Sequence, residues 1–301
     1  MVDQPYRGAH VCGEHLDATV EARFRRSLNR QLPRFARGTV AVALSGGKDS
    51  SVALSLAHRN LAPRPGVRLV AISVDEGISG YRTRTLRAAG TLTHALGVEH
   101  VIVRARTELG TTTDGLARAT PGTPPCSYCG VWRRQLLNRA ARNAGADALI
   151  LGFNLDDLAQ TVLMNLVRGD LDRLARMAPH RGVTKALVPR LAPLDQVPER
   201  EVFLYALRAK LPFDHAECPH AGRALRNRFR EIVWELESAH PGTRQSLLRA
   251  RDRILEGRSA AGTAAGPSAC LVCGEPSSGG VCRSCEFLRA ARTASILAGP
   301  A

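Results

Sequence analysis

The chain has 301 residues, with 42 Lys and Arg against 27 Asp and Glu, and eight cysteines. The formal charge of +15 favours a polyanionic partner such as nucleic acid, because bound cations release counterions from phosphates. No apolar run approaches the roughly 20 residues of a membrane span and no signal-peptide core opens the sequence, so we expect a cytosolic protein without membrane contact. In that compartment the cysteines should bind metal or carry redox chemistry rather than form structural disulfides.

The first 37 residues predict an arginine-rich amphipathic helix over 16–37, with a break near Pro33. Ahead of it, Cys12 and His15 have half of a metal-site spacing. This pattern alone fits a partial zinc site and a surface turn equally well.

Residues 39–51 read T-V-A-V-A-L-S-G-G-K-D-S-S, a buried parallel strand followed by a glycine turn and a helix start. Backbone N–H groups at such a helix start suit phosphate. A turn without ligand remains possible. A Walker-type loop is excluded because Lys48 precedes Asp49 and the required earlier glycine is missing, and a dinucleotide fingerprint lacks its third glycine.

A β-α-β rhythm follows, with strands over 67–74 and 98–103 and a helix over 81–96. It predicts a doubly wound α/β fold with a parallel sheet. Because neighbouring strands end at one ligand crevice, Val74 and Asp75 should lie beside Ser45.

A long connection over 104–125 delivers Cys126 and Cys129, which a helix follows. The strand over 148–151 then leads into Gly152, two aspartates and another helix, which the same strand-end rule places in the crevice.

The carboxyl-terminal third is basic and helical. After a β-like stretch over 183–191, helices are expected over 198–211, 223–237 and 241–258, with Cys218 between the first two. Residues 259–269 read as a linker. Four cysteines in two C-x-x-C knuckles then predict a structural zinc ribbon, and they are Cys270, Cys273, Cys282 and Cys285.

The S-G-G-K-D-S loop resembles that of the PP-loop ATP pyrophosphatases. With C-S-Y-C-G-V-W-R-R-Q and G-F-N-L-D-D-L-A-Q-T-V-L-M-N-L-V-R-G-D, the chain resembles the tRNA 2-thiolation enzymes, the TtcA/TtuA group, and most closely their archaeal and eukaryotic cytoplasmic branch. The motifs span about residues 39 to 285 in the family's order. The resemblance implies an adenine nucleotide α-hydrolase-like PP-loop fold with a helical extension and a zinc ribbon.

Three interpretations of Cys126, Cys129 and Cys218 stay open on the residues alone. They are a zinc site completed by a histidine, a persulfide or disulfide pair, and a 4Fe-4S cluster with one iron left free for sulfide. The resemblance favours the cluster.

The resemblance also implies a reaction in which ATP adenylates a uridine C2 oxygen and sulfur then replaces it, giving 2-thiouridine. Two alternative functions remain for the sequence. They are sulfur transfer to a small metabolite, and RNA binding by a zinc-ribbon protein without catalysis. Mg²⁺ is expected at Asp49, and roles in substrate positioning are expected for Arg133 and Asp157. The expected nucleotide-binding positions are Ala43, Leu44, Ser45, Gly46, Gly47, Lys48, Asp49, Ser50, Val74, Asp75, Arg133 and Gly152.

The expected partners are tRNA and a ubiquitin-like thiocarboxylate carrier or free sulfide, and a homodimer is possible. Three departures from the family pattern stand out: Phe153 replaces a histidine, Arg133 replaces a lysine of the TtuA branch, and the C-x-x-C expected before Cys12 is missing. The expected organisation is an amino-terminal segment 1–37, a catalytic domain 38–195, a tRNA-binding extension 196–258, a linker 259–269 and a ribbon with tail 270–301.

Overall fold

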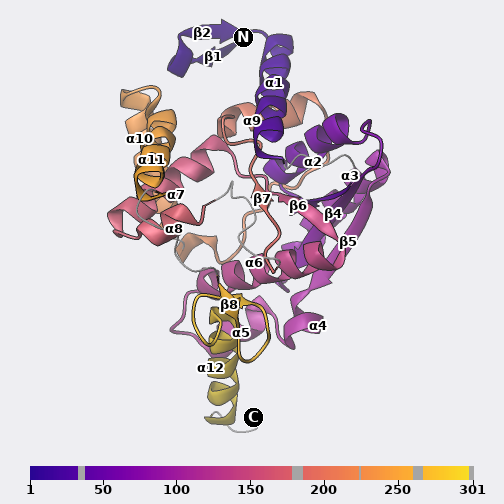
Figure 1. Ribbon diagram of the computed structural model, residues 1–301, viewed down its shortest axis with the longest axis vertical. Helices are drawn as coiled ribbons and strands as arrows, with labels where there is room; N and C mark the ends of the chain where they lie inside the picture. The colour runs from indigo at the N-terminus through magenta and orange to yellow at the C-terminus, as the bar shows by residue number, and fades with distance from the viewer. Residues whose placement is uncertain (33–37, 178–185, 224, 260–266, 298–301) are drawn as a thin grey trace.

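A five-stranded parallel sheet lies at the centre of the computed structural model, which describes residues 1–32, 38–177, 186–223, 225–259 and 267–297 (Figure 1). The strand order is β5-β4-β3-β6-β7, and every neighbouring pair is parallel. The doubly wound sheet predicted from the sequence is therefore confirmed. The strands are β3 (Gly38–Ala43), β4 (Val67–Asp75), β5 (Glu99–Arg104), β6 (Ala146–Ile150) and β7 (Arg190–Leu191).

Two hydrophobic cores cover the two faces of this sheet. Val40 and Val42 face one core and Ala41 the other, because successive side chains of a strand point to opposite faces. The first core is closed by α1 (Gly13–Gln31), α2 (Lys48–Leu61), α3 (Arg82–Leu96) and α9 (Glu199–Arg208). The second is closed by α6 (Pro125–Asn143), α7 (Leu155–Val167), α10 (Leu225–Ala239) and α11 (Thr243–Ser259).

The segment expected as a long connection contains two short helices, α4 (Ala105–Leu109) and α5 (Thr113–Ala119). Gly110 ends the first in the left-handed conformation, and the Thr112 side chain caps the second by accepting from the Gly115 N–H. Helices this short have too few turns to show apolar periodicity. Local capping residues were the available signal.

Three further features were not anticipated. The amino terminus forms an antiparallel hairpin of β1 (Val2–Gln4) and β2 (Ala9–Val11). A short helix α8 (Leu171–Ala175) follows α7, and 3₁₀ turns occupy Pro5–Arg7 and Ala221–Arg223.

The carboxyl-terminal unit consists of β8 (Ser268–Ala269), β9 (Pro276–Ser277) and α12 (Arg283–Leu297). It lies beside α5 and α6, at the end of the molecule opposite the amino-terminal hairpin (Figure 1). The expected break near Pro33, the first part of the β-like stretch at 183–185 and most of the linker fall outside the described residues. Within the described ranges, no helix has the length and apolarity to cross a membrane.

Candidate functional site

The glycine turn after β3 is a tightly bonded loop. The Ser50 hydroxyl accepts from the Ser45 N–H (3.1 Å) and donates to the Gly47 carbonyl (2.9 Å). Gly46 has φ +83°, and a Cβ there would lie 1.9 Å from the Thr85 carbonyl oxygen, so only glycine fits. Among the described side chains none caps the start of α2, which leaves its first N–H groups for an anionic ligand.

Charged side chains surround this loop. The Lys48 ammonium donates to Asp49 (3.0 Å) and to Glu199 on α9 (2.8 Å). Burial works against the charged form of Lys48, but the two carboxylates outweigh it and raise its pKa. The Asn154 amide donates to the second oxygen of Asp49 (2.9 Å). Asp49 is thus held between a cation and an amide, with its carboxylate at the helix start.

Asp157, at the start of α7, lies near Asp49. Asn154 and Asp157 form a capping box, in which the Asp157 N–H donates to the Asn154 side chain (2.9 Å). Burial and the nearby Asp49 raise the pKa of Asp157 to about 6, while Arg226, 3.4 Å away, opposes the shift. A carboxyl group with such a pKa can be either ionised or protonated near neutral pH.

The ends of β3 and β6 approach each other closely here. A Cβ at Gly152 would lie 2.9 Å from the backbone of Asp49 and Ser50, so a larger residue would push the two loops apart. Because strand order reverses at β3, this is the topological switch point at which open α/β sheets bind ligands.

The first turns of α6 carry Cys126 and Cys129, so the cysteines lie inside the helix rather than ahead of it as expected. Cys218, in the segment after α9, packs against the apolar cluster that contains Cys129 and Trp132. The Cys126 Sγ lies 3.7 Å from the His220 carbonyl oxygen. All three cysteines therefore lie near the amino-terminal end of α6.

The segment that carries Cys218 also reaches the glycine turn. The Asp214 N–H donates to the Gly46 carbonyl (2.9 Å), and Cys218 follows four residues later. Four residues span at most about 14 Å, which bounds the distance from Asp214 to this cysteine. The glycine turn and Cys218 are thus joined by one short stretch of chain.

A buried carboxylate makes a second connection between the two. Glu76, 1% exposed, lies between Arg82 (Nε to Oε2, 2.8 Å) and Arg133 (Nε to Oε1, 2.5 Å). Arg133 donates to the Cys129 sulfur (3.5 Å), and Arg82 donates to the Ser45 carbonyl (3.1 Å) and to the Val74 carbonyl. We call Arg82, Glu76 and Arg133 the buried relay after its buried carboxylate, since the Arg133 side chain itself is 48% exposed.

The relay also affects the protonation of Arg133 and Cys129. Glu76 raises the pKa of Arg133, which therefore stays cationic. Burial raises the pKa of the Cys129 thiol, and the Arg133 charge works in the opposite direction by favouring the thiolate. Glu76 and Arg82 were missed in the sequence, although Glu76 directly follows the end of β4, where the strand-end rule applies. Asn154 and Glu199 were missed as well.

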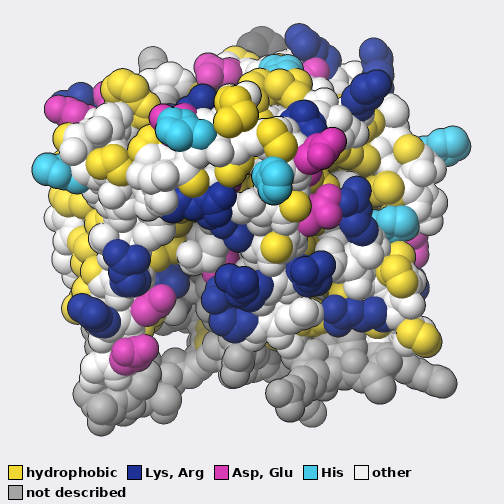
Figure 2. Space-filling view, turned by 90° about the horizontal axis from the view of Figure 1, so that it is seen from above, with side chains coloured by type: hydrophobic (Ala, Val, Ile, Leu, Met, Phe, Trp, Pro, Cys, Tyr) yellow, Lys and Arg dark blue, Asp and Glu magenta, His cyan; other side chains and the backbone are white. Residues whose placement is uncertain are grey.

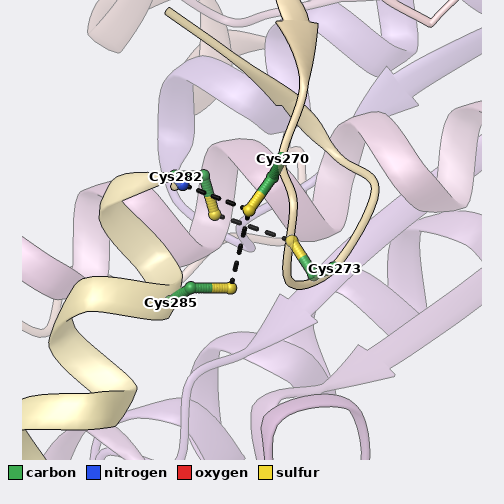
Figure 3. Close-up of side chains that lie close together, drawn as sticks. All are labelled: Cys270, Cys273, Cys282 and Cys285. Carbon is green, nitrogen blue, oxygen red and sulfur yellow. Dashed lines mark hydrogen bonds between the residues drawn. The ribbon is translucent and has the colours of Figure 1, made fainter. Parts of the chain in front are cut away.

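The four carboxyl-terminal cysteines point toward one another (Figure 3). All their sulfurs lie within 4.8 Å of one another, as expected for one tetrahedral ion. The backbone N–H of Cys282 donates to Cys270 and lowers its pKa to about 6, which favours the thiolate that binds metal. Glu275 ties this cluster to α6 through Arg139 (2.9 Å) and Arg142 (2.8 Å).

Within the described residues, no other group of three or more such ligands comes within that distance. Cys126, Cys129 and Cys218 therefore do not form a preformed single-ion site. A 4Fe-4S cluster is a larger body that holds its ligands farther apart, and three thiolates suit one with an open iron. At the amino terminus, Cys12 contacts His15 (3.0 Å). The partial zinc site there stays a prediction.

Comparison with known proteins gives consistent matches. A family model described as a PP-loop domain matches residues 17–237. The chain is 38% identical to tRNA 2-thiolation protein NcsA of Haloferax volcanii over 94% of both chains, and 38% identical to cytoplasmic tRNA 2-thiolation protein 1 of Bos taurus, covering 95% of this chain and 83% of that protein.

A solved structure also matches over most of its length. It is described as the U34-tRNA thiolase NcsA from Methanococcus maripaludis with its [4Fe-4S] cluster. The alignment has a TM-score of 0.84 and 35% identity, and it covers 96% of this chain and 92% of that one.

Proposed function

This chain belongs to the family of tRNA 2-thiolation proteins with a PP-loop domain, and from that premise we propose that it is an ATP-dependent tRNA uridine 2-sulfurtransferase. The relatives' names support tRNA as the sulfur acceptor over a small metabolite. The tightly bonded nucleotide loop supports catalysis over RNA binding alone. The cytoplasm is the proposed compartment, as in the names of the eukaryotic relatives.

The first step activates the uridine. Its C2 oxygen attacks the α-phosphorus of ATP, pyrophosphate leaves, and the oxygen becomes part of an AMP leaving group. The N–H groups at the start of α2 and the Lys48 ammonium are proposed to stabilise the phosphates. Asp49 is the proposed Mg²⁺ ligand. Asp157, near Asp49, is proposed to position the uracil base by hydrogen bonding. With its raised pKa, the carboxyl group can accept a hydrogen bond when ionised and donate one when protonated.

The second step replaces the activated oxygen. Sulfide attacks C2, the C–O bond breaks, and AMP leaves with the former uridine oxygen. Cys126, Cys129 and Cys218 are the residues that would hold a 4Fe-4S cluster, which supplies an iron able to bind sulfide. Arg133 is proposed to orient Cys129 and to stabilise negative charge beside it.

The remaining cofactor and partner assignments are part of the same proposal. The four carboxyl-terminal cysteines would hold a structural Zn²⁺ that fixes the ribbon against α6. The sulfur would arrive from a thiocarboxylate carrier protein or as free sulfide, and a homodimer is a possible assembly.

The observation that carries the proposal is the double connection between nucleotide loop and thiols, through the segment from Asp214 to Cys218 and through the buried relay. The test is an anaerobic incubation of cluster-loaded protein with ATP, Mg²⁺, sulfide and an unmodified tRNA transcript. We expect AMP and 2-thiouridine to form together. Formation of neither product, or of a thiolated metabolite only, would contradict the proposal.

A further inference from the structure

A cavity of about 840 Å³ lies between α1 and the turn that joins α10 to α11. Its basic lining residues are Arg23, Arg26, Arg30, His240 and Arg249. None of the cysteines and none of the Ser45–Ser50 loop lines it. The volume falls within the range of about 300–1,000 Å³ typical of small-molecule sites, so it can hold a nucleotide-sized unit.

The walls of this arginine cavity carry positive charge without facing carboxylates. Within the described part of the chain, no Asp or Glu lines it. The acids that fix Arg23 and Arg30 are Glu201 (3.2 Å) and Asp195 (2.9 Å). Both acids are buried, at 3% and 4% exposure, behind the lining. The acids thus hold two guanidinium groups in place but do not compete for a ligand in the cavity.

Two further guanidinium groups are left for a ligand. Arg26 is exposed and has no ion pair or hydrogen bond to another described side chain. Within the same described residues, the partner of the Arg249 guanidinium is the Ser246 hydroxyl (2.9 Å). Arginine presents a planar fork of donors that matches phosphate oxygens. Figure 2 views the molecule from the end where α1 lies, and Lys and Arg side chains gather near the middle of this face.

The segment that lines the cavity also contacts the start of α7. Thr243 and Gln245 line the cavity, and Arg244 between them forms an ion pair with Asp156 (2.5 Å). Asp156 is the neighbour of Asp157 at the start of α7. An RNA strand held in the cavity would therefore run next to the crevice in which the uridine reacts.

We infer that the arginine cavity binds the phosphodiester backbone of the RNA substrate beside the nucleotide that is modified. The inference rests on the proposed function for the identity of the RNA. Phosphate contacts of this kind fix the position of the strand without reading its sequence.

The test is tRNA binding by the full-length, cluster-loaded protein carrying Arg26→Glu and Arg249→Glu. Both side chains are exposed, so folding should persist. We expect the dissociation constant for an unmodified tRNA transcript to rise about tenfold or more, and the slope of log K against log salt to become shallower by about 1–2. ATP affinity should not change. The Arg26→Lys, Arg249→Lys variant should retain most of the binding.

The matched control is Arg87→Glu with Arg106→Glu, two exposed arginines on α3 and α4 whose side chains have no described partner. Equal losses in both variants, or an unchanged slope in the cavity variant, would overturn the inference. Full displacement of tRNA by inorganic phosphate at constant ionic strength would also overturn it and identify a free-anion site. If the wild-type protein thiolated no tRNA, the proposed function itself would fail.

Discussion

Replacing Glu76 by glutamine removes the charge at the centre of the buried relay and keeps its size. Glu76 and Arg82 have side chains that are 1% and 6% exposed, and removing one partner of a buried pair costs about 3–5 kcal/mol. Arg133 is 48% exposed, so water screens its ion pair with Glu76. Loss of that pair should add little to the cost. We expect the free energy of unfolding at pH 7 to fall by about 3 kcal/mol, within that range.

Equilibrium unfolding in urea measures this loss. The slope of the unfolding free energy against urea concentration should not change, because unfolding exposes the same surface in both proteins. The control is Glu99→Gln, which breaks the exposed Arg68–Glu99 pair and should cost less than about 1 kcal/mol. In the Glu76→Gln background, Arg82→Met should cost less than it does alone. Additive effects of Glu76→Gln and Arg82→Met on the free energy of unfolding would show that the two side chains do not interact. A Glu76→Gln cost no larger than that of Glu99→Gln would refute the idea that the relay connects the glycine turn to the cysteines.

Three other changes test the remaining parts. Because burial and Asp49 raise the pKa of Asp157 to about 6 from 3.8, the folded state binds this proton more tightly than the unfolded state. Ionisation therefore destabilises the fold as pH rises from about 4 to about 6. Asp157→Asn should be more stable than wild type by about 1–3 kcal/mol at pH 7 and equal to it below about pH 4; urea unfolding showing no gain at pH 7 would contradict this. Lys48→Ala should slow AMP formation about 10²–10³-fold in single-turnover assays, and a loss below tenfold would argue against a role at the phosphates. Cys273→Ser should lose about one zinc ion per chain by elemental analysis, whereas unchanged zinc content would exclude the ribbon as its site.

Local signals were enough for the sheet and the nucleotide loop. The apolar run of β3, the glycines at 46 and 47 and the polar start of α2 are consecutive in sequence, so their pattern reports directly on their structure. The cluster of four carboxyl-terminal cysteines is similar, because the spacing of the two C-x-x-C pairs fixes which sulfurs can meet.

Contacts between segments that are distant in sequence could not be predicted from local patterns. Glu76 and Arg133 are 57 positions apart, and Arg244 meets Asp156 across 88 positions. No periodicity encodes such pairs, since they depend on how complete elements pack. The early start of α6 was missed for a different reason: Pro125 is well suited to a first helical turn, but its neighbours Pro124 and Thr123 read as a loop.

The central claim is that nucleotide loop and cysteines act on the same uridine oxygen. The most direct measurement uses tRNA whose uridine C2 oxygen is labelled with ¹⁸O, incubated with ATP, Mg²⁺, sulfide and the cluster-loaded protein under anaerobic conditions. Mass spectrometry of the nucleotide product should find the label in AMP, in proportion to the 2-thiouridine formed. Thiolated tRNA accompanied by unlabelled AMP would contradict the account.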